Sequence, residues 1–215
     1  MNLFAIRKQA DKVLRPLVVS CALVPLSANA WTLLGAVAGV IAAAAFYRGY
    51  WLLGLLVLAA RGLLDHVDGY VARSRRQTTI YGAVLDDLSD RWVLGVVYAG
   101  GCLRLARIYP HLVLVFAAGV IGALSNVIIK LSIYSQTAQD QVVEQGKVGH
   151  PVDNVGLFGS AEFLIWFGVP ILLMIVFERP VLGAAGAWAV AILSHVSLAQ
   201  RVLFARRRYA ARSSS

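Results

Sequence analysis

Long apolar runs, separated by short polar or basic connectors, make up most of this chain. A run of about 20 apolar residues is long enough to cross a bilayer as a helix. The connectors are short, and no linker or internal repeat interrupts the pattern. It therefore predicts a single all-α domain over residues 1–215, a polytopic membrane bundle of six transmembrane helices. The six predicted spans cover about residues 31–47, 51–74, 79–105, 110–134, 156–177 and 181–204.

The two ends of the chain have a different pattern from the bundle at 31–205. Residues 1–16 carry apolar side chains at helical spacing with basic residues opposite, which predicts an amphipathic interfacial helix. A cleaved signal peptide is the alternative, because apolar residues 17–26 precede an Ala-Asn-Ala sequence. The length of the amphipathic pattern and the many later spans favour the interfacial helix. Residues 206–215 form a basic tail.

Composition supports a membrane protein. Of 215 residues, 59% are hydrophobic and 14% charged, and the mean hydropathy is +0.71, far from the balance of a soluble domain. The net charge of +9 does not indicate nucleic acid, because Lys and Arg gather at the ends of apolar runs. They predict orientation instead, with both termini cytoplasmic. Cys21 and Cys102 lie in separate runs and indicate neither a disulfide framework nor a thiolate metal site.

Acidic residues interrupt the second and third spans beside the basic loop at 73–76. On a helix, Asp65 and Asp68 lie roughly 60° apart and Asp86 and Asp90 roughly 40° apart, so each pair shares a face. The two helices are adjacent and antiparallel, so the four carboxylates can converge. Because a carboxylate in a bilayer costs several kcal/mol unless compensated, such residues indicate function.

The chemistry of this acidic stretch favours a hard divalent cation. All its ligands are oxygens, without thiolate or a clear imidazole partner, so Mg²⁺ or Mn²⁺ is expected rather than Zn²⁺. Two such ions would balance four carboxylates. A cation pair suits a diphosphate, because it neutralises phosphate oxygens and stabilises displacement at phosphorus. Arg73 adds a donor for the same phosphates.

The order D-x2-D-G-x2-A-R-x8-G-x3-D-x3-D closely resembles the signature of the CDP-alcohol phosphotransferases. The matching residues are Asp65, Asp68, Gly69, Ala72, Arg73, Gly82, Asp86 and Asp90. Asn29 and Thr32 resemble the family's Asn-x-x-Thr before the first span, which also disfavours a signal peptide. The six-span layout is similar, so the resemblance covers most of the chain, whereas its motifs cover residues 29–90. Fixed residues at fixed spacing on two helices make it a specific signal.

The resemblance implies an enzyme of phospholipid biosynthesis. It would transfer a phospho-alcohol from a CDP-linked donor to an acceptor hydroxyl and release CMP, at the cytoplasmic face of a prokaryotic plasma membrane, as a homodimer. Asp65, Asp68 and Asp86 would hold the metals, and Asp90 would be the general base, also able to touch a metal. The residues that would contact the CDP group are Asn29, Thr32, Asp68, Gly69, Ala72, Arg73 and Gly82.

Two charged residues beside the motif residues have alternative roles. Asp87 lies about 100° from Asp86 around the helix, which favours a supporting or interface role over metal ligation. Arg61 lies one turn before Asp65 and either pairs with it or reaches an anionic acceptor.

Lys130 and Arg91 are candidates for binding the acceptor, with a helix-end or interhelical pair as the equal alternative for each. Family members acting on inositol phosphate carry a basic cluster at the end of the fourth span, where this chain has Lys130 alone. This difference disfavours an acceptor that carries a phosphate monoester.

The sequence leaves alternatives for the identity of the donor and for the class of function. A CDP-diacylglycerol-like lipid donor with a small polar alcohol is the leading hypothesis, and a soluble CDP-alcohol with a lipid acceptor is the close alternative. A cation transporter is the rival of another class. It would place carboxylates near mid-bilayer on broken helices, whereas here they adjoin a basic loop. A non-catalytic scaffold would not need four aspartates.

Overall fold

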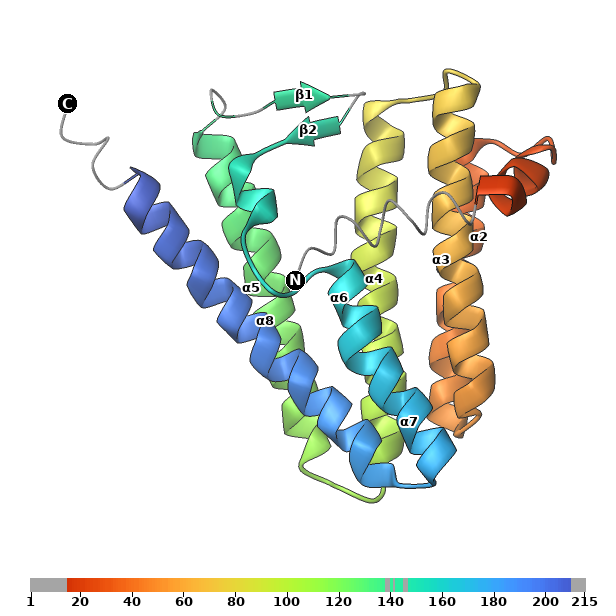
Figure 1. Cartoon of the computed structure of the whole chain (residues 1–215), viewed down its shortest axis with the longest axis vertical. Coiled ribbons are helices and arrows are strands. Elements are labelled where there is room, and N and C mark those ends of the chain that lie inside the picture. The colour runs from red at the N-terminus through yellow and green to blue at the C-terminus, as the bar shows by residue number, and fades with distance from the viewer. Residues whose placement is uncertain (1–14, 138–139, 141, 145–146, 210–215) are drawn as a thin grey trace. The chain divides into compact units, whose positions relative to one another are not determined.

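The computed structural model describes residues 15–137, 140, 142–144 and 147–209. Helices dominate it, as the apolar pattern predicts (Figure 1). An antiparallel hairpin of β1 (Val142–Glu144) and β2 (Lys147–Gly149) in the polar connector was not predicted. The long helices are α2 (Ala28–Arg48), α3 (Trp51–Ser74), α4 (Ile80–Leu105), α5 (Leu112–Gln136) and α8 (Pro180–Tyr209).

Three of the long helices, α2, α5 and α8, are long and apolar enough to cross a membrane. The stretch Leu164–Phe177 is apolar but shorter. Helices α3 and α4 are equally long but carry the acidic motif, which lowers their hydropathy. The chain is therefore a largely helical membrane protein. Most of the predicted interfacial helix lies outside the described residues, although residues 15–22 are helical, and the predicted basic tail is helical up to Tyr209.

The chain divides into two compact units. The acidic unit comprises Met1–Phe46 and Leu52–Val97, and the C-terminal unit comprises Tyr47–Trp51 and Tyr98–Ser215. Helix α4 contributes its first part to the acidic unit and its last turns to the C-terminal unit. The whole acidic motif lies in the acidic unit.

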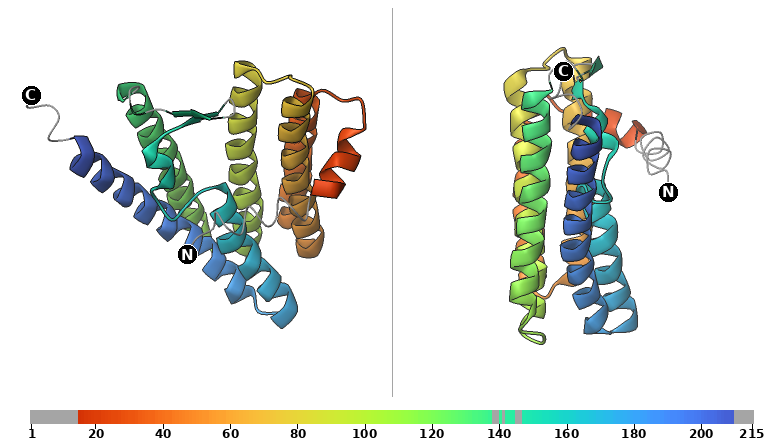
Figure 2. Two further views of the ribbon diagram at one scale, coloured as in Figure 1. Left: turned by 45° about the horizontal axis from the view of Figure 1, so that its top comes forward. Right: turned by 90° about the vertical axis from the view of Figure 1, so that its left-hand side faces the viewer.

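Glycines allow close helix packing in the acidic unit. A Cβ atom at Gly54 of α3 would lie 2.6 Å from Cδ1 of Phe46, and one at Gly39 of α2 would lie 2.6 Å from Cγ2 of Val93. Phe46 and Val93 are both fully buried. Small residues at such contacts let membrane helices approach closely. Figures 1 and 2 show that α3 and α4 run antiparallel, with residues 75–79 between them.

The basic loop after α3 holds the segment before α2. Arg75 donates hydrogen bonds to the carbonyl oxygens of Leu26 at 2.7 Å, Ala22 at 2.7 Å and Val24 at 3.0 Å. Its neighbour Arg76 takes a left-handed conformation, with φ of 52°, that ends the helix. We interpret the arginines of this loop from the sequence as topology signals. The structure shows that Arg75 also has a structural role.

Helix α5 packs against α8 in the C-terminal unit. Tyr98 donates to the carbonyl oxygen of Ala187 at 2.8 Å and meets the rings of Phe163 and Phe167 edge-on. Such edge-to-face contacts are favourable for aromatic rings. These contacts join α4, α8 and the fifth predicted span into one core.

The fifth predicted span is helical but irregular. It consists of α6 (Ser160–Phe163), a π-helical turn at Leu164–Gly168 and α7 (Val169–Phe177). The sequence predicts a kink at Pro170, and the irregular turn ends two residues before it, at Gly168. Proline has no N–H to donate to the carbonyl one turn earlier, so the regular α-helical ladder is interrupted here.

Candidate active site and metal centre

Three aspartates of the acidic unit converge. Asp65 and Asp68 on α3 and Asp86 on α4 each offer a carboxylate oxygen, and these oxygens lie within 4.8 Å of one another. The i, i+3 spacing places the first two on one face of α3, and the antiparallel α4 brings the third opposite them. The predicted convergence is present for these three residues.

Asp68 is the most buried of the three, with 6% of its surface exposed. The hydroxyl of Thr32 donates to its Oδ2 at 2.8 Å, and the carbonyl oxygen of Ala28, at 3.2 Å, is the alternative acceptor for that proton. A hydrogen bond to one carboxylate oxygen fixes the orientation of the group, as in many metal sites. The Asn-x-x-Thr motif on α2 therefore contributes a side chain that orients Asp68.

The three-carboxylate group fits a hard divalent cation. Its donors are all carboxylate oxygens, the ligands that Mg²⁺ and Mn²⁺ prefer. Like charges this close together repel one another, and a cation between them removes that repulsion. The chain thus offers the oxygen ligands that its sequence predicts for a divalent metal ion.

Asp90 is not one of these three clustered residues and is paired with an arginine. The guanidinium of Arg61 on α3 contacts Oδ1 of Asp90 and lies 3.8 Å from Oδ1 of Asp65. The sequence indicates that Arg61 pairs with Asp65, one turn away on the same helix. It does not predict that Arg61 also pairs with Asp90. The missing signal is the register of the helices: Arg61 precedes Asp65 by one turn, and Asp90 follows Asp86 by one turn on the antiparallel neighbour.

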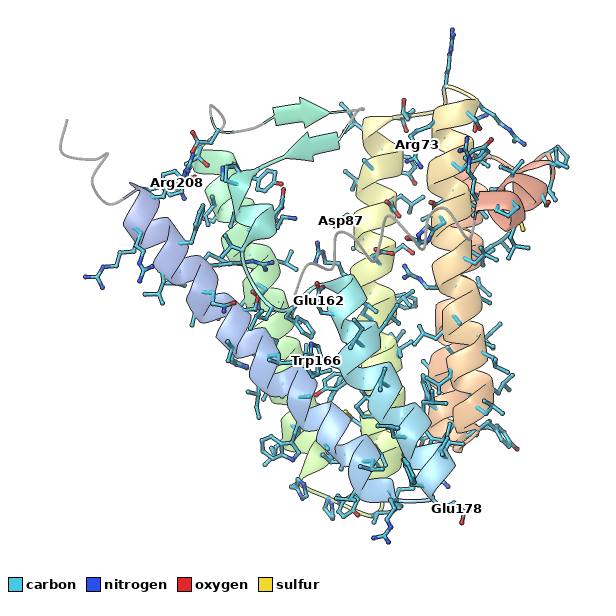
Figure 3. The ribbon with its side chains drawn as sticks, viewed as in Figure 1. Arg73, Asp87, Glu162, Trp166, Glu178 and Arg208 are labelled. Carbon is cyan, nitrogen blue, oxygen red and sulfur yellow. The ribbon has the colours of Figure 1, made fainter. Side chains whose placement is uncertain are left out.

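The loop ends of α3 and α4 carry the small residues of the motif. A Cβ atom at Gly69 would lie 3.2 Å from Nη1 of Arg73, so the missing side chain leaves room for that guanidinium. Figure 3 shows Arg73 near the loop end of α3. Ala72, on the same turn, packs against the buried cluster around Val67 and Val71.

Gly82 lies at the start of α4 beside two polar side chains. Its N–H donates to Oγ1 of Thr79 at 2.9 Å. A Cβ atom at Gly82 would lie 3.2 Å from Oδ1 of Asn29 on α2. The amino end of a helix carries partial positive charge and unpaired N–H groups, so it suits phosphate. Asn29 and Gly82, separate in the sequence, thus meet at one end of the acidic unit.

Three other candidate residues have partners of their own. Arg91 pairs with Asp87 on its own helix at 2.9 Å, and the Asp87 side chain is 61% exposed. Asp87 lies outside the three-carboxylate group (Figure 3). In the C-terminal unit, Lys130 pairs with Asp153 at 2.7 Å and lies over the ring of Tyr134.

Known proteins share both sequence and fold with this chain. Residues 25–194 match the family model described as CDP-alcohol phosphatidyltransferase. A phosphatidylinositol phosphate synthase of Streptomyces avermitilis is 34% identical over 86% of this chain and 74% of its own.

Two crystal structures of the Mycobacterium tuberculosis phosphatidylinositol phosphate synthase are also similar. One, with CDP-DAG bound, has a TM-score of 0.73 and 25% identity and covers 91% of this chain and 94% of its own. The other, in complex with manganese and citrate, has a TM-score of 0.71 and 25% identity over 88% and 87%.

The acidic motif, the oxygen-only ligand group and the family match agree with one another. Members of this family carry out phosphatidyl-type transfer from a CDP-linked donor to an alcohol, with release of CMP. The chain belongs to the CDP-alcohol phosphatidyltransferase family and is a metal-dependent transferase of phospholipid biosynthesis.

Proposed function

We propose that this chain transfers a phosphatidyl group from CDP-diacylglycerol to the hydroxyl of a small polar alcohol. The convergence of Asp65, Asp68 and Asp86 carries the proposal, because it provides the metal group that a diphosphate donor needs. The choice of a lipid donor is supported by the M. tuberculosis relative, which binds CDP-DAG. A soluble CDP-alcohol with a lipid acceptor remains the alternative donor arrangement.

In this proposal the three aspartates hold Mg²⁺ or Mn²⁺. The metal, when bound, neutralises phosphate oxygens and stabilises the displacement at phosphorus. Thr32 keeps the carboxylate of Asp68 in one orientation.

The CDP group would lie at the loop ends of α3 and α4. Arg73 and the amino end of α4 bind the diphosphate. The residues that allow or make close contact with the CDP group are Asn29, Gly69, Ala72 and Gly82.

Asp90 is proposed as the general base. It takes the proton of the acceptor hydroxyl as that oxygen forms a bond to the phosphorus of the phosphatidyl group. The bond between this phosphorus and the bridging oxygen breaks, and CMP leaves with that oxygen. Contact with a metal is the second expected role of Asp90. A base must lie within hydrogen-bonding reach of the proton it accepts.

The acceptor is proposed to be an inositol-type alcohol, since the S. avermitilis and M. tuberculosis relatives are phosphatidylinositol phosphate synthases. An unphosphorylated acceptor is the second candidate. The ion pair between Lys130 and Asp153 favours it, because an ammonium already held by a carboxylate is a poorer phosphate ligand. The expected roles of Lys130 and Arg91 at the acceptor belong to this part of the proposal.

We further propose that the chain works as one catalytic domain with six spans and a cytoplasmic site, as a homodimer. The family match supports a single domain because it runs through both units. The basic residues at the loop ends of apolar helices support the orientation. No nucleic acid is proposed as a partner.

CMP release from the purified protein tests the function. CDP-diacylglycerol is offered with glycerol phosphate, serine, inositol or inositol phosphate, with and without Mg²⁺ or Mn²⁺. We expect release with one acceptor class, loss of release with a chelator, and no turnover by Asp90→Asn. Wild-type-like turnover in that variant would overturn the assignment of the base.

Two further measurements separate the alternatives. A soluble CDP-alcohol offered with diacylglycerol tests the reversed donor, and turnover there alone would overturn the lipid donor. Uptake of Mn²⁺ into proteoliposomes tests transport. Metal flux without CMP release would replace the transferase proposal with a transporter.

A further inference from the structure

We propose that the turn between α2 and α3 and the end of α4 bind the phosphate group of an anionic phospholipid. We call this place the arginine site. It consists of Tyr47, Arg48 and Gly49 of the turn together with Arg104 and Arg107, and all five residues belong to the C-terminal unit. The acidic motif contributes no residue to it.

Two guanidinium groups of the arginine site lie against the turn between α2 and α3. Arg104 and Arg107 are one helical turn apart, and the N–H of Arg107 donates to the carbonyl oxygen of Arg104 at 3.3 Å. A Cβ atom at Gly49 would lie 3.0 Å from both Nε and Nη2 of Arg104. The guanidinium carbon of Arg107 lies 5.3 Å from the centre of the Tyr47 ring. Both cations therefore meet neighbouring residues of one turn.

Gly49 makes the close approach of Arg104 possible. Its φ of 89° lies in the left-handed region, which glycine adopts without strain. Because Gly49 has no side chain, the guanidinium of Arg104 packs on the backbone, and this arginine is half-buried. A guanidinium held in place by packing presents its N–H groups in a fixed plane. Such a planar group suits the oxygens of a phosphate.

No carboxylate neutralises the arginine site. Residues 31–64 and 91–139 contain neither Asp nor Glu. Among the described residues, none of Arg48, Arg104 and Arg107 takes part in an ion pair. Like charges one helical turn apart repel each other. The carboxyl ends of α2 and α4 carry about half an elementary negative charge each, less than the three positive charges here. An anionic ligand would supply the missing negative charge.

The surroundings of the arginine site favour a lipid over a free phosphate. Tyr47 is 43% exposed, Tyr50 63% and Ile108 57%. Exposed aromatic rings beside basic residues are typical of the head-group level of a membrane. From Ile80 to Arg104, α4 extends about 36 Å, whereas the apolar core of a bilayer is about 30 Å thick. The helix is thus long enough to place the arginine site at the membrane surface opposite its own start.

The test compares three probes on the full chain purified in detergent. Phosphatidylglycerol is an anionic phosphodiester with acyl chains, phosphatidylcholine has the same chains without net charge, and glycerol 3-phosphate has no chains. Native mass spectrometry counts the lipids that the protein retains, and thermal unfolding measures the stabilisation by each probe.

The main variant is Arg104→Gln/Arg107→Gln. Its control, Arg206→Gln/Arg207→Gln, removes the same charge from exposed arginines in the last turn of α8. Figure 1 shows that this turn lies at the other end of the C-terminal unit from residues 105–111. Gly49→Ala is the third variant, because its methyl group would displace the Arg104 guanidinium without changing the net charge.

We expect phosphatidylglycerol to raise the melting temperature of the wild type by about 3 °C. Arg104→Gln/Arg107→Gln should lose at least half of this increase and retain one lipid molecule fewer. Arg206→Gln/Arg207→Gln should keep both, and Gly49→Ala should bind phosphatidylglycerol about three- to tenfold more weakly. Phosphatidylcholine should give a smaller increase, and glycerol 3-phosphate none at the same concentration.

Unchanged retention of phosphatidylglycerol by folded Arg104→Gln/Arg107→Gln would overturn the proposal. An equal loss in Arg206→Gln/Arg207→Gln would show general attraction by net charge, and equal binding of phosphatidylcholine would exclude selection of an anion. If glycerol 3-phosphate stabilises the wild type as much as the lipid does, the arginine site binds free phosphate instead. Should the main variant fail to fold, the exposed Arg107→Gln alone decides by the same measurements.

Discussion

Charges are arranged differently in the two units: besides its ion pairs the acidic unit has a cluster of carboxylates, and no such carboxylate cluster is found among the described residues of the C-terminal unit. The acidic unit gathers three carboxylates whose oxygens lie within 4.8 Å of one another. In the C-terminal unit, Asp153 pairs singly with Lys130 at 2.7 Å and Asp140 with Arg208 at 3.2 Å. Collected like charges destabilise a fold until a ligand neutralises them, whereas pairs are satisfied by the protein itself. The first arrangement indicates a binding site, and the second indicates structure.

Two buried polar side chains show the same contrast. Asn126 of α5, only 4% exposed, donates to the carbonyl oxygens of Gly122 at 2.8 Å and Ser194 at 2.6 Å and accepts from Arg201 at 2.9 Å. Its hydrogen bonds all end within the C-terminal unit. Asp68 accepts from Thr32 but also faces two further carboxylates. Isosteric substitution at the two positions should therefore separate stability from activity.

The largest effect is expected for Asp68→Asn. Loss of a metal ligand should lower turnover by at least about 100-fold, because the metal supplies several kcal/mol of transition-state stabilisation. The metal-free variant should melt at the same temperature as wild type or about 1–3 °C higher, since one of three repelling charges is gone. CMP release and thermal unfolding in detergent measure the two quantities. A less stable but fully active variant would contradict the comparison.

Asn126→Leu should have the reverse effect. It removes two hydrogen-bond donors and an acceptor of Arg201, so the free energy of unfolding should fall by about 1–3 kcal/mol. Thermal unfolding measures the loss, and the increase in melting temperature on adding Mn²⁺ should remain. Ile128→Leu, at an exposed position of the same helix, serves as the control. A variant that keeps its stability but no longer melts at a higher temperature when Mn²⁺ is added would show that Asn126 contributes to metal binding.

Arg75→Ala tests a cation of the acidic unit that serves structure. It removes three hydrogen bonds to carbonyl oxygens of residues 22–26. Local opening there should become easier by about 1 kcal/mol, which corresponds to roughly fivefold faster amide exchange. Hydrogen–deuterium exchange of residues 15–27 measures it, with Arg76→Ala as the neighbouring control. Unchanged exchange would mean that these bonds add nothing to the segment.

The smallest effect is a pH dependence in the C-terminal unit. Burial of the Asp153 carboxyl acts to raise its pKa, but hydrogen bonds from Lys130, Tyr134 and the His150 backbone outweigh it and lower the pKa below the ordinary 3.8. The stabilisation by ionised Asp153 is therefore fully present above that value and is lost as the pH falls through the lower folded-state pKa.

Thermal unfolding of wild type and Asp153→Asn measures this dependence. The difference in melting temperature between the two proteins should stay constant from about pH 7 to 5 and shrink below about pH 4. A difference that already shrinks between pH 7 and 5 would contradict the lowered pKa.

The features that could be predicted from the sequence are those that follow from helical periodicity and short loops. The convergence of Asp65, Asp68 and Asp86 follows from spacing on two helices joined by a tight loop, so it could be predicted. The contact between Arg61 and Asp90 depends on how far one helix slides along the other. That register is set by packing, such as Gly39 against Val93, which leaves no periodic signal.

Outside the motif, the connector shows the same limit. The pairing of Lys130 with Asp153 depends on how residues 137–155 fold back, and this stretch has too few apolar positions for a pattern to predict it. Its hairpin is held by backbone hydrogen bonds between β1 and β2. Helices α2, α5 and α8 were predictable because each is a long apolar run, and the hairpin was not because its strands are short.

The π-helical turn at Leu164–Gly168 also bears on how this chain can change in length. A π-turn holds one residue more than an α-turn, so it is equivalent to a single insertion within a helix. Removing one residue from the turn would restore a continuous α-helix, and Glu162 before it would rotate by about 100° relative to α7. A homologue shorter by one residue here could keep both flanking helices while presenting a different face of α6.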